Sequence, residues 1–256
     1  MLANKYSNQG RKVILCDCDV ECPNDYLLIN KKLKKPRQKI YSFFPSLDKR
    51  KCRKCGLCAK HCRNHVIFHL PGKYPVFIKD LCSGCGVCWN ICPYKAIKPK
   101  KEKIGEIYLN KIKENFWLIT GLVNSKTQET ASAVSQVKKF SINLAEKKKI
   151  GMIIFDTAAG THCPVVKAII DADKAELVTE PTPMGAYDLE IMIDLLRKLK
   201  VKSEIIINQM DLGNKSFIFK IAQKNQIKIK KEIPYSKEIA NAYSKGQLLK
   251  INFSNI

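Results

Sequence analysis

The sequence predicts an α/β protein whose mostly parallel sheet is interrupted by a small cysteine-rich module. Two observations carry this prediction. Short apolar runs alternate with amphipathic stretches over most of the chain, and eight cysteines gather in two adjacent runs between residues 52 and 92. Regular alternation of strands and helices implies right-handed crossovers and a sheet that helices cover on both faces.

The two cysteine runs share the pattern C-x2-C-x2-C-x3-C, at residues 52–62 and 82–92. Three cysteines at this spacing can bind one face of an iron–sulfur cube, while the fourth points away and binds the other cube. Each run therefore needs its twin, and we predict two 4Fe–4S clusters. The expected ligands are Cys52, Cys55, Cys58 and Cys92 for cluster I, and Cys82, Cys85, Cys88 and Cys62 for cluster II.

Residues around these cysteines favour the same interpretation. Gly56, Gly84 and Gly86 suit tight turns in which backbone amides approach the cluster sulfides. Pro93 follows the second run as in the bacterial ferredoxin pattern, whereas Arg63 takes that place after the first. A pair of zinc knuckles is the alternative, since C-x2-C is also a zinc spacing, but eight thiolates exceed one zinc site. Disulfides are not expected, because the chain opens with no signal peptide.

Composition limits the class of partner. The formal net charge is +23, and the only acids between residues 31 and 103 are Asp48, Asp80 and Glu102. A solvated lysine surface explains much of this charge, and a specific patch would favour an acidic redox protein. Nucleic acid is not expected, because the lysines are not interleaved with aromatic residues. No apolar run reaches the length of a membrane span, and we expect a cytoplasmic protein.

Two lysine-rich segments are expected to act as linkers around the cysteine module. They cover residues 31–39, which include Pro36, and residues 98–103, which include Pro99. The module then reads as an insertion, and the sequence on either side of it should form one fold. The expected divisions are residues 1–36 and 104–256 for the two parts of the α/β domain, and residues 37–103 for the inserted 4Fe–4S domain.

The expected elements follow from apolar periodicity and from breakers. Residues 1–9 have helical spacing and end at Gly10, so they read as the last turns of a helix. The expected strands are 12–16, 151–155, 175–178, 204–207 and 227–231, and the expected helices are 129–147, 164–172, 187–199, 215–225 and one that starts near residue 236.

Four segments outside the cysteine module resemble the MinD/Mrp-like P-loop ATPases, the group that includes ParA and the nitrogenase iron protein. Residues 17–24 (DCDVECPN) resemble switch I, and residues 155–165 (FDTAAGTHCPV) resemble switch II. Residues 178–185 and 207–211 look like the segments that border the nucleotide base. The resemblance is to the subgroup labelled cobyrinic acid a,c-diamide synthase-like, in which a two-cluster ferredoxin domain interrupts the ATPase after switch I. It implies a sheet of the P-loop NTPase type.

The resemblance also implies roles for three acidic residues. Asp19 would hold a magnesium-bound water, and Asp17 would orient or activate the attacking water. Asp156 would hold the outer ligands of the metal at the end of its strand. Taken alone, Asp156 could instead be a helix N-cap before a loop.

The same resemblance implies three nucleotide-binding residues. Gly160 would let a backbone amide approach the γ-phosphate, Asn208 would read the adenine edge, and Asp211 lies in the same base-bordering segment. However, the Walker A motif G-x-x-x-x-G-K-[ST] occurs nowhere in the sequence. We therefore expect the first strand of the fold to be missing, and ATP with Mg²⁺ to bind only if a longer reading frame or a separate upstream chain supplies the loop. The chain alone should not hydrolyse ATP.

The leading functional interpretation is a protein in which the nucleotide state of the ATPase part controls electron transfer through the clusters, or their handling. Relatives of this kind dimerise, so we expect a homodimer when the protein is complete. One alternative is an electron-transfer subunit whose α/β part is only a scaffold. A glutamine-dependent synthase, suggested by the subgroup label, is disfavoured because no glutaminase cysteine constellation is found.

Four further cysteines lie outside the two runs. Cys16, Cys18 and Cys22 surround the switch I-like segment, and Cys163 lies in the switch II-like segment. They could form a third metal site, but small residues are common at buried strand ends. We therefore expect them to be structural.

Overall fold

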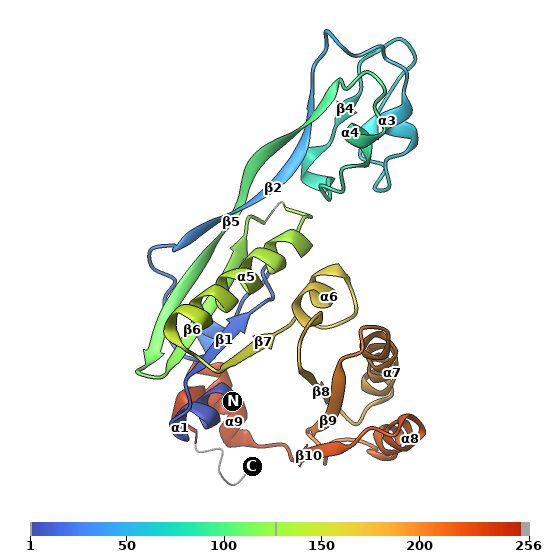
Figure 1. The fold of residues 1–256 in the computed structure, drawn as a ribbon. Helices are drawn as coiled ribbons and strands as arrows, with labels where there is room; N and C mark the ends of the chain where they lie inside the picture. The colour runs from blue at the N-terminus through green and yellow to red at the C-terminus, as the bar shows by residue number, and fades with distance from the viewer. Residues whose placement is uncertain (1, 126, 252–256) are drawn as a thin grey trace.

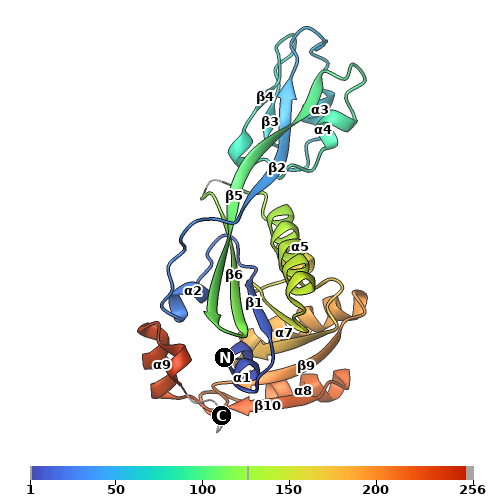
Figure 2. The same ribbon diagram turned by 60° about the vertical axis from the view of Figure 1, so that its left-hand side comes forward.

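The computed structural model describes residues 2–125 and 127–251. Figure 1 shows an α/β body and a small lobe, which a long two-stranded ribbon holds away from the body. The ribbon consists of β2 (Gln38–Leu47) and β5 (Ile97–Lys113), and the lobe is residues 48–96 between them. The body comprises the remaining elements. A second view shows the lobe again at the far end of the ribbon (Figure 2).

A five-stranded sheet forms half of the body, in the order β2-β5-β6-β1-β7. Strand β1 (Val13–Asp17) lies between β6 (Phe116–Val123) and β7 (Met152–Asp156) and runs parallel to both. Strand β5 is antiparallel to β2 and β6. The apolar run of β1 is buried nearly throughout, as a central parallel strand requires.

The ribbon overturns one expectation about the linkers. Residues 98–103 lie inside β5, which pairs with β2 from Ile97 opposite Leu47 to Ile107 opposite Gln38. The lysines there are exposed on a solvated ribbon, where charged side chains keep a β-edge from pairing with other chains. A charge run therefore looked like a linker although it belongs to a strand. The lobe is joined to the central sheet by continuous strands.

Helix α5 (Ala131–Lys148) covers one face of the five-stranded sheet. Its Val137 belongs to the same buried core as Ile14 of β1. Gly121 of β6 permits this approach, because a Cβ atom there would lie 2.5 Å from Cγ2 of Val137 and 2.8 Å from Cγ1 of Val20. Real Cβ contacts are longer, so any side chain at this position must displace the helix or the loop.

The opposite face of the sheet is covered by the two ends of the chain. Helix α1 (Leu2–Asn8) places Ala3 against Val13 and Phe116. Leu249, in the short 3₁₀ helix after α9 (Lys237–Ser244), packs against the same cluster. The helix expected near the start of the chain is thus confirmed.

A second sheet of three parallel strands completes the body. Its order is β10 (Ile229–Ile233), β9 (Lys202–Asn208) and β8 (Lys174–Thr179). Helices α7 (Pro183–Lys198) and α8 (Ser216–Asn225) pack on one face of it. The core on this face includes Leu177, Leu189, Ile193, Ile205, Ile207 and Ile218.

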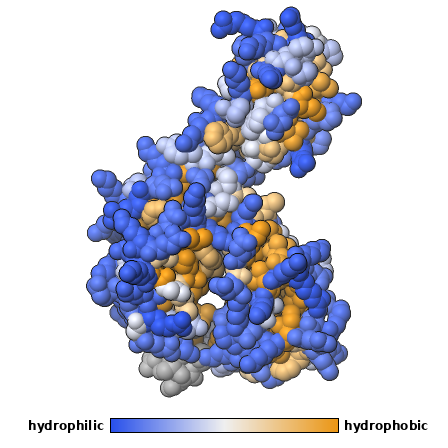
Figure 3. Space-filling model, viewed as in Figure 1, coloured by the Kyte–Doolittle hydropathy of each residue, from blue (hydrophilic) through white to orange (hydrophobic). Residues whose placement is uncertain are grey.

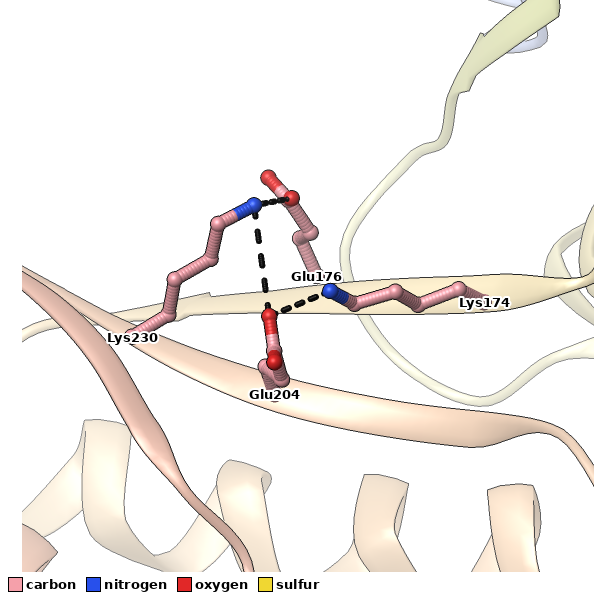
Figure 4. A network of polar contacts seen from close by, with 4 residues as sticks. All are labelled: Lys174, Glu176, Glu204 and Lys230. Carbon is pink, nitrogen blue, oxygen red and sulfur yellow. Dashed lines mark hydrogen bonds and ion pairs between the residues drawn. The ribbon is translucent and has the colours of Figure 1, made fainter.

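The other face of the three-stranded sheet carries a network of ion pairs (Figure 4). Glu204 of β9 pairs with Lys174 of β8 and lies 3.9 Å from Nζ of Lys230 of β10. Lys230 also pairs with Glu176 of β8. The four side chains link all three strands on the face that α7 and α8 leave free. Because they are partly exposed, each pair contributes little to stability by itself.

The two sheets of the body are not joined in the described residues. Strands β7 and β8 follow each other through α6 (Cys163–Ile169), yet each is the edge of a different sheet. The apolar residues 152–155 of β7 are all only half-buried, and Val178 of β8 is 65% exposed. Figure 3 shows hydrophobic side chains lining a hollow in this half of the body. We call the space between the edges of β7 and β8 the slot.

The predicted α/β class is confirmed, with the expected strands and helices of the body present and shifted by a few residues at their ends. Strand β6 and the body half of β5 were not predicted, because the segment between the cysteine module and α5 was not assigned. No described helix is long and apolar enough to span a membrane.

The contact of Gly121 with α5 gives a test of this packing. We expect Gly121→Ala to lower the free energy of unfolding by about 1–3 kcal/mol, because the added methyl group overpacks the core. Gly151→Ala is the matched control, since a Cβ there meets nothing within 4 Å. Urea unfolding followed by circular dichroism measures both. Equal stability of the two variants would contradict the packing of α5 on β6.

Candidate functional site

The lobe is built from two similar turns, each of which leads into a single helical turn. Helix α3 (Leu57–Lys60) follows Gly56, and α4 (Val87–Asn90) follows Gly86. Both glycines have positive φ, 75° and 83°. A Cβ at Gly56 would lie 2.9 Å from Nδ1 of His69, and one at Gly86 would lie 2.9 Å from the Trp89 ring. A side chain at either position would be strained and would collide with its neighbour, so both turns favour glycine.

Two cavities lie in the lobe, and each is lined by four cysteines. Cavity I is lined by three cysteines of the first run together with Cys92 from the second. Cavity II is lined by three cysteines of the second run together with Cys62 from the first. The grouping has the crossed form that the spacing of the runs implies. The cysteines are Cys52, Cys55, Cys58 and Cys92 in cavity I, and Cys62, Cys82, Cys85 and Cys88 in cavity II.

Three thiols of the lobe are in surroundings that raise their pKa. Burial, with the nearby Cys82, raises the pKa of Cys88 to about 12. Burial also raises the pKa of Cys58 and of Cys82. Four thiolates in such a cavity need compensating positive charge, which iron would supply, and binding would release the thiol protons. An all-sulfur donor set in an apolar cavity suits an iron–sulfur cluster.

Backbone amides add to this environment. The amide of Lys54 donates to Sγ of Cys52 at 3.4 Å, and the amide of Ala96 donates to Sγ of Cys92 at 3.4 Å. Hydrogen bonds to cysteine sulfur are one of the features that set the reduction potential of a cluster. Both of these amides serve cysteines of cavity I.

Cavity II lies at the side of the lobe that meets the body. A Cβ at Gly84 would lie 3.1 Å from the carbonyl oxygen of Phe43 and 3.7 Å from Cγ of Glu129, just before α5. Cys82 packs against the core of the five-stranded sheet. The loop of the second cysteine run therefore contacts both the ribbon and the start of α5.

A second candidate site lies at the carboxyl ends of β1 and β7. Asp17 and Asp156 are opposite each other in the parallel register. Oδ2 of Asp17 accepts hydrogen bonds from the amides of Asn24 (3.1 Å) and Asp25 (3.2 Å), and Oδ1 accepts one from the amide of Asp19 (3.1 Å). Asp17 thus shapes the whole loop that follows β1. Parallel sheets bind ligands at this edge.

The carboxyl group of Asp17 is poorly solvated, with the residue 2% exposed. Burial raises the pKa of Asp17 to about 7, and the charge of Asp156 adds to the shift. Burial also raises the pKa of Asp156, although one side of this residue reaches solvent. The cluster is a place where negative charge is costly until a cation or a proton compensates it.

Asp25 is a member of this cluster that the sequence did not single out. It is 8% exposed, and its Oδ2 is buried with no hydrogen-bond partner. Burial, followed by the charges of Asp156 and Asp17, raises its pKa to about 8. The residue begins the short helix α2 (Asp25–Leu28), where an acid is ordinarily an exposed helix start. Its position after Asn24 gave no sign of burial.

The remaining predicted nucleotide residues occupy different positions. Gly160 has φ 87°, and a Cβ there would meet only Nδ1 of His162, at 3.5 Å, so its backbone is open to approach. Asn208 ends β9 in the other sheet. Oδ1 of Asp211 accepts a hydrogen bond from the amide of Tyr235 at 2.7 Å, which fixes the turn after β9. The acidic cluster and Gly160 therefore lie at the carboxyl ends of β1 and β7 or in the loops after them. Asn208 and Asp211 lie at the carboxyl end of β9, in the second sheet.

The cysteines of the body divide into two kinds. Cys16 and Cys18 are buried with their sulfurs 3.7 Å apart, and Ser141 donates to Sγ of Cys16 at 3.1 Å. Cys22 and Cys163 are exposed.

Known proteins are similar to this chain over nearly its whole length or over a part of it. An uncharacterized protein of Methanocaldococcus jannaschii is 34% identical over 249 residues, 96% of this chain and 84% of that protein. The pyruvate synthase subunit PorD of Methanothermobacter marburgensis is 42% identical over 62 residues, 24% of this chain and 72% of that protein. The cell division ATPase MinD of Pyrococcus furiosus has a similar fold, with a TM-score of 0.56 at 15% identity, covering 97% of this chain and 81% of that one.

A protein-family model also matches nearly the whole chain. The CobQ/CobB/MinD/ParA nucleotide binding domain matches residues 1–249, which include the lobe as well as both sheets of the body. The fold and this match agree. The chain belongs to the CobQ/CobB/MinD/ParA family of nucleotide-binding domains.

Proposed function

We propose that this protein binds two 4Fe–4S clusters in its lobe and couples the nucleotide state of its body to electron transfer or to cluster handling. The observation that carries the proposal is the pair of cavities, each lined by four cysteines drawn from both runs. Similarity to a subunit of pyruvate synthase over part of the chain supports a redox role. The family match supports nucleotide binding by the body.

A cluster explains the cavities better than a single metal ion does. Four ligands of one zinc ion each lie about 2.3 Å from it when all are thiolates, so their sulfurs must converge closely. Among the described residues, no three cysteine, histidine or acidic side chains converge in this way. The cysteines surround wider cavities, in which the four-iron cube would lie between the sulfurs.

The nucleotide half of the proposal rests on the acidic edge of the first sheet. Asp19 and Asp156 would act on magnesium through its waters, Asp17 would position the water that attacks, and Gly160 would allow close backbone approach to phosphate. Asn208 and Asp211 would border the base from the second sheet. The protein would be cytoplasmic and would form a homodimer.

The phosphate-binding loop has a natural place in this body. The slot is bounded by the edges of β7 and β8, which pair with no further strand in the described residues, and an unpaired edge of this kind accepts a further strand. A parallel strand in the slot would end beside Asp156, so the turn that follows it would meet the acidic cluster. We infer that a strand followed by a Walker A loop fills the slot, and that the chain hydrolyses no ATP unless such a loop is supplied.

Coupling between the two halves would use contacts already described. The loop after β1 is tied to Asp17, and β1 is in the same sheet as the ribbon. The loop of the second cysteine run contacts the ribbon and the start of α5. A nucleotide-driven change at the acidic edge would therefore reach cavity II through packed elements.

The second candidate is an electron-transfer subunit whose body is a scaffold. The partial similarity to PorD, and to the ketoisovalerate oxidoreductase subunit VorD of Pyrococcus furiosus, favours it. A cluster-loaded protein that binds no nucleotide when the slot is filled would select this alternative.

Crossed ligation gives the first test. We expect Cys62→Ser/Cys85→Ser to lose about half of the bound iron, because both cysteines line cavity II, whereas Cys62→Ser/Cys55→Ser should lose nearly all of it, because it damages both sites. Iron analysis and electron paramagnetic resonance of the reduced proteins measure this. Cys22→Ser/Cys163→Ser is the control and should keep its iron. Equal iron in the two lobe variants would exclude the crossed arrangement.

The slot gives the second test. We expect the printed chain to hydrolyse ATP no faster than a protein-free blank, and its outward-facing β7 amides to exchange quickly with deuterium. A fusion that adds a strand and a Walker A loop ahead of Met1 should protect those amides and gain hydrolysis. Asp156→Asn in the fusion is the control and should keep protection but lose hydrolysis. Hydrolysis by the printed chain, or no protection in the fusion, would refute the proposal.

The buried Asp25 predicts an unusual pH dependence. Its carboxyl loses a proton near 3.8 when unfolded and near 8 when folded. The folded state binds more protons between these values, so stability must fall as the pH rises. We expect Asp25→Asn to reduce the loss of unfolding free energy between pH 5 and 8 by about 1–4 kcal/mol.

Urea titrations of anaerobically prepared protein at several pH values would measure this dependence. The exposed Asp188→Asn is the control and should follow the parent curve. A variant curve that is parallel to that of the parent would show that Asp25 is ionised at neutral pH.

A further inference from the structure

The outer end of the lobe carries a dense cluster of positive charge beside cavity I. Five of the six residues from 49 to 54 are basic and exposed, and no acid occurs between Asp48 and Asp80. In the part of the chain that the structure describes, none of these five side chains forms an ion pair. We call this surface the basic tip. It consists of Lys49, Arg50, Lys51, Arg53 and Lys54.

The basic tip is held in place by neighbouring side chains. Nζ of Lys54 lies 4.7 Å from the centre of the Tyr74 ring, and Nζ of Lys49 lies 5.6 Å from it. Nε2 of His69 lies within hydrogen-bond distance of the Lys54 carbonyl, at 3.1 Å. Both ammonium groups thus lie near the same aromatic ring, and attraction to the ring offsets their mutual repulsion.

The two cavities differ in charge and in position. Arg53 and Lys54 line cavity I, together with Tyr94, which is 47% exposed. The residues that line cavity II carry no charged side chain apart from the cysteines. As described above, the loop of cavity II also packs against the body. Cavity I is therefore the positive, outward-facing one, and cavity II is the neutral one nearer the body.

We propose that the basic tip is the docking surface for an acidic electron-carrier protein, which exchanges electrons with the cluster of cavity I. This inference rests on the proposed function, because it requires clusters in the lobe. One electron leaves the reduced carrier, which is oxidised, and reduces the cluster of cavity I. The cluster of cavity II then lies between that point of entry and the body.

Charge favours this occupant and this direction. Opposite potentials steer two proteins together and raise the association rate by 10- to 1000-fold at low salt. Reduction adds negative charge to a cluster, and the cations that line cavity I would stabilise that charge. A cluster in cavity I would therefore accept an electron more readily than a cluster in cavity II. The exposed rings near the tip are too few to form a stacking platform for single-stranded nucleic acid.

Charge reversal tests the docking surface without altering a cysteine run. The test variant is Lys49→Glu/Arg50→Glu/Lys51→Glu, which lies before Cys52. The matched control is Lys198→Glu/Lys220→Glu/Lys228→Glu, three exposed lysines of the body. Iron content and the absorption spectrum are recorded first. Loss of clusters from the parent protein would defeat the proposed function itself and is seen before any docking is measured.

A small acidic ferredoxin, chemically reduced, serves as the carrier. Stopped-flow measurements at low salt should show at least a tenfold slower reduction of the test variant, with the control unchanged. The rate for the parent should fall with added salt, and the rate for the test variant should hardly change. Titration calorimetry of the oxidised carrier should show the same loss of affinity. Photoreduction by a neutral deazaflavin should proceed equally in all three proteins.

Two ligand variants test which cavity faces the carrier. Cys62→Ser keeps the ligands of cavity I and should keep fast reduction by the ferredoxin, whereas Cys92→Ser keeps those of cavity II and should lose it. Equal rates for the test variant and the control would overturn the docking surface. Fast reduction of Cys92→Ser would overturn the assignment to cavity I. Binding of duplex DNA at the tip in preference to the ferredoxin would show that the surface serves a nucleic acid.

Discussion

The crossed grouping of cysteines is the constraint on which the lobe depends. Neither run can complete a ligand set alone, so the two loops, their helical turns and the segment between them must fold as one unit. Gly56 and Gly86 allow the tight turns of the two loops, where a side chain would collide with His69 and Trp89. Burial opposes ionisation of Cys88, so four thiolates in its cavity would need cationic iron for compensation. Under the proposed function, folding of the lobe and cluster binding would therefore be one equilibrium.

The ribbon determines how the lobe is connected to the body. Strand β5 runs from Ile97, beside the cluster cavities, to Lys113, in the sheet that also contains β1 and β7. A flexible linker would have separated the motions of the two parts. Continuous strands transmit twist, and the contact of the second cysteine loop with Glu129 supplies a second path. The lobe is thus mechanically part of the sheet that carries the acidic edge.

Much of this arrangement followed from local patterns in the sequence. Cysteine spacing predicted two ligand sets, and apolar alternation predicted the strands and helices of the body. Residues 98–103 were misread because a lysine run on a solvated strand has the composition of a linker. The burial of Asp25 and the proximity of Glu129 to Gly84 depend on contacts between distant segments, which no local pattern encodes. The basic tip was visible as charge, but its position beside cavity I became clear only in three dimensions.

The slot has a consequence for the life of the protein in a cell. Two apolar strand edges that can each accept a partner do not discriminate strongly between partners. If a further strand fills the slot as proposed, the edge of a neighbouring copy would compete with it, and this side reaction would grow with concentration. The timing of synthesis would then govern yield, since a chain whose slot is filled early escapes self-association. The yield of folded protein would then depend on whether the slot pairs first with its own strand or with the strand edge of another copy.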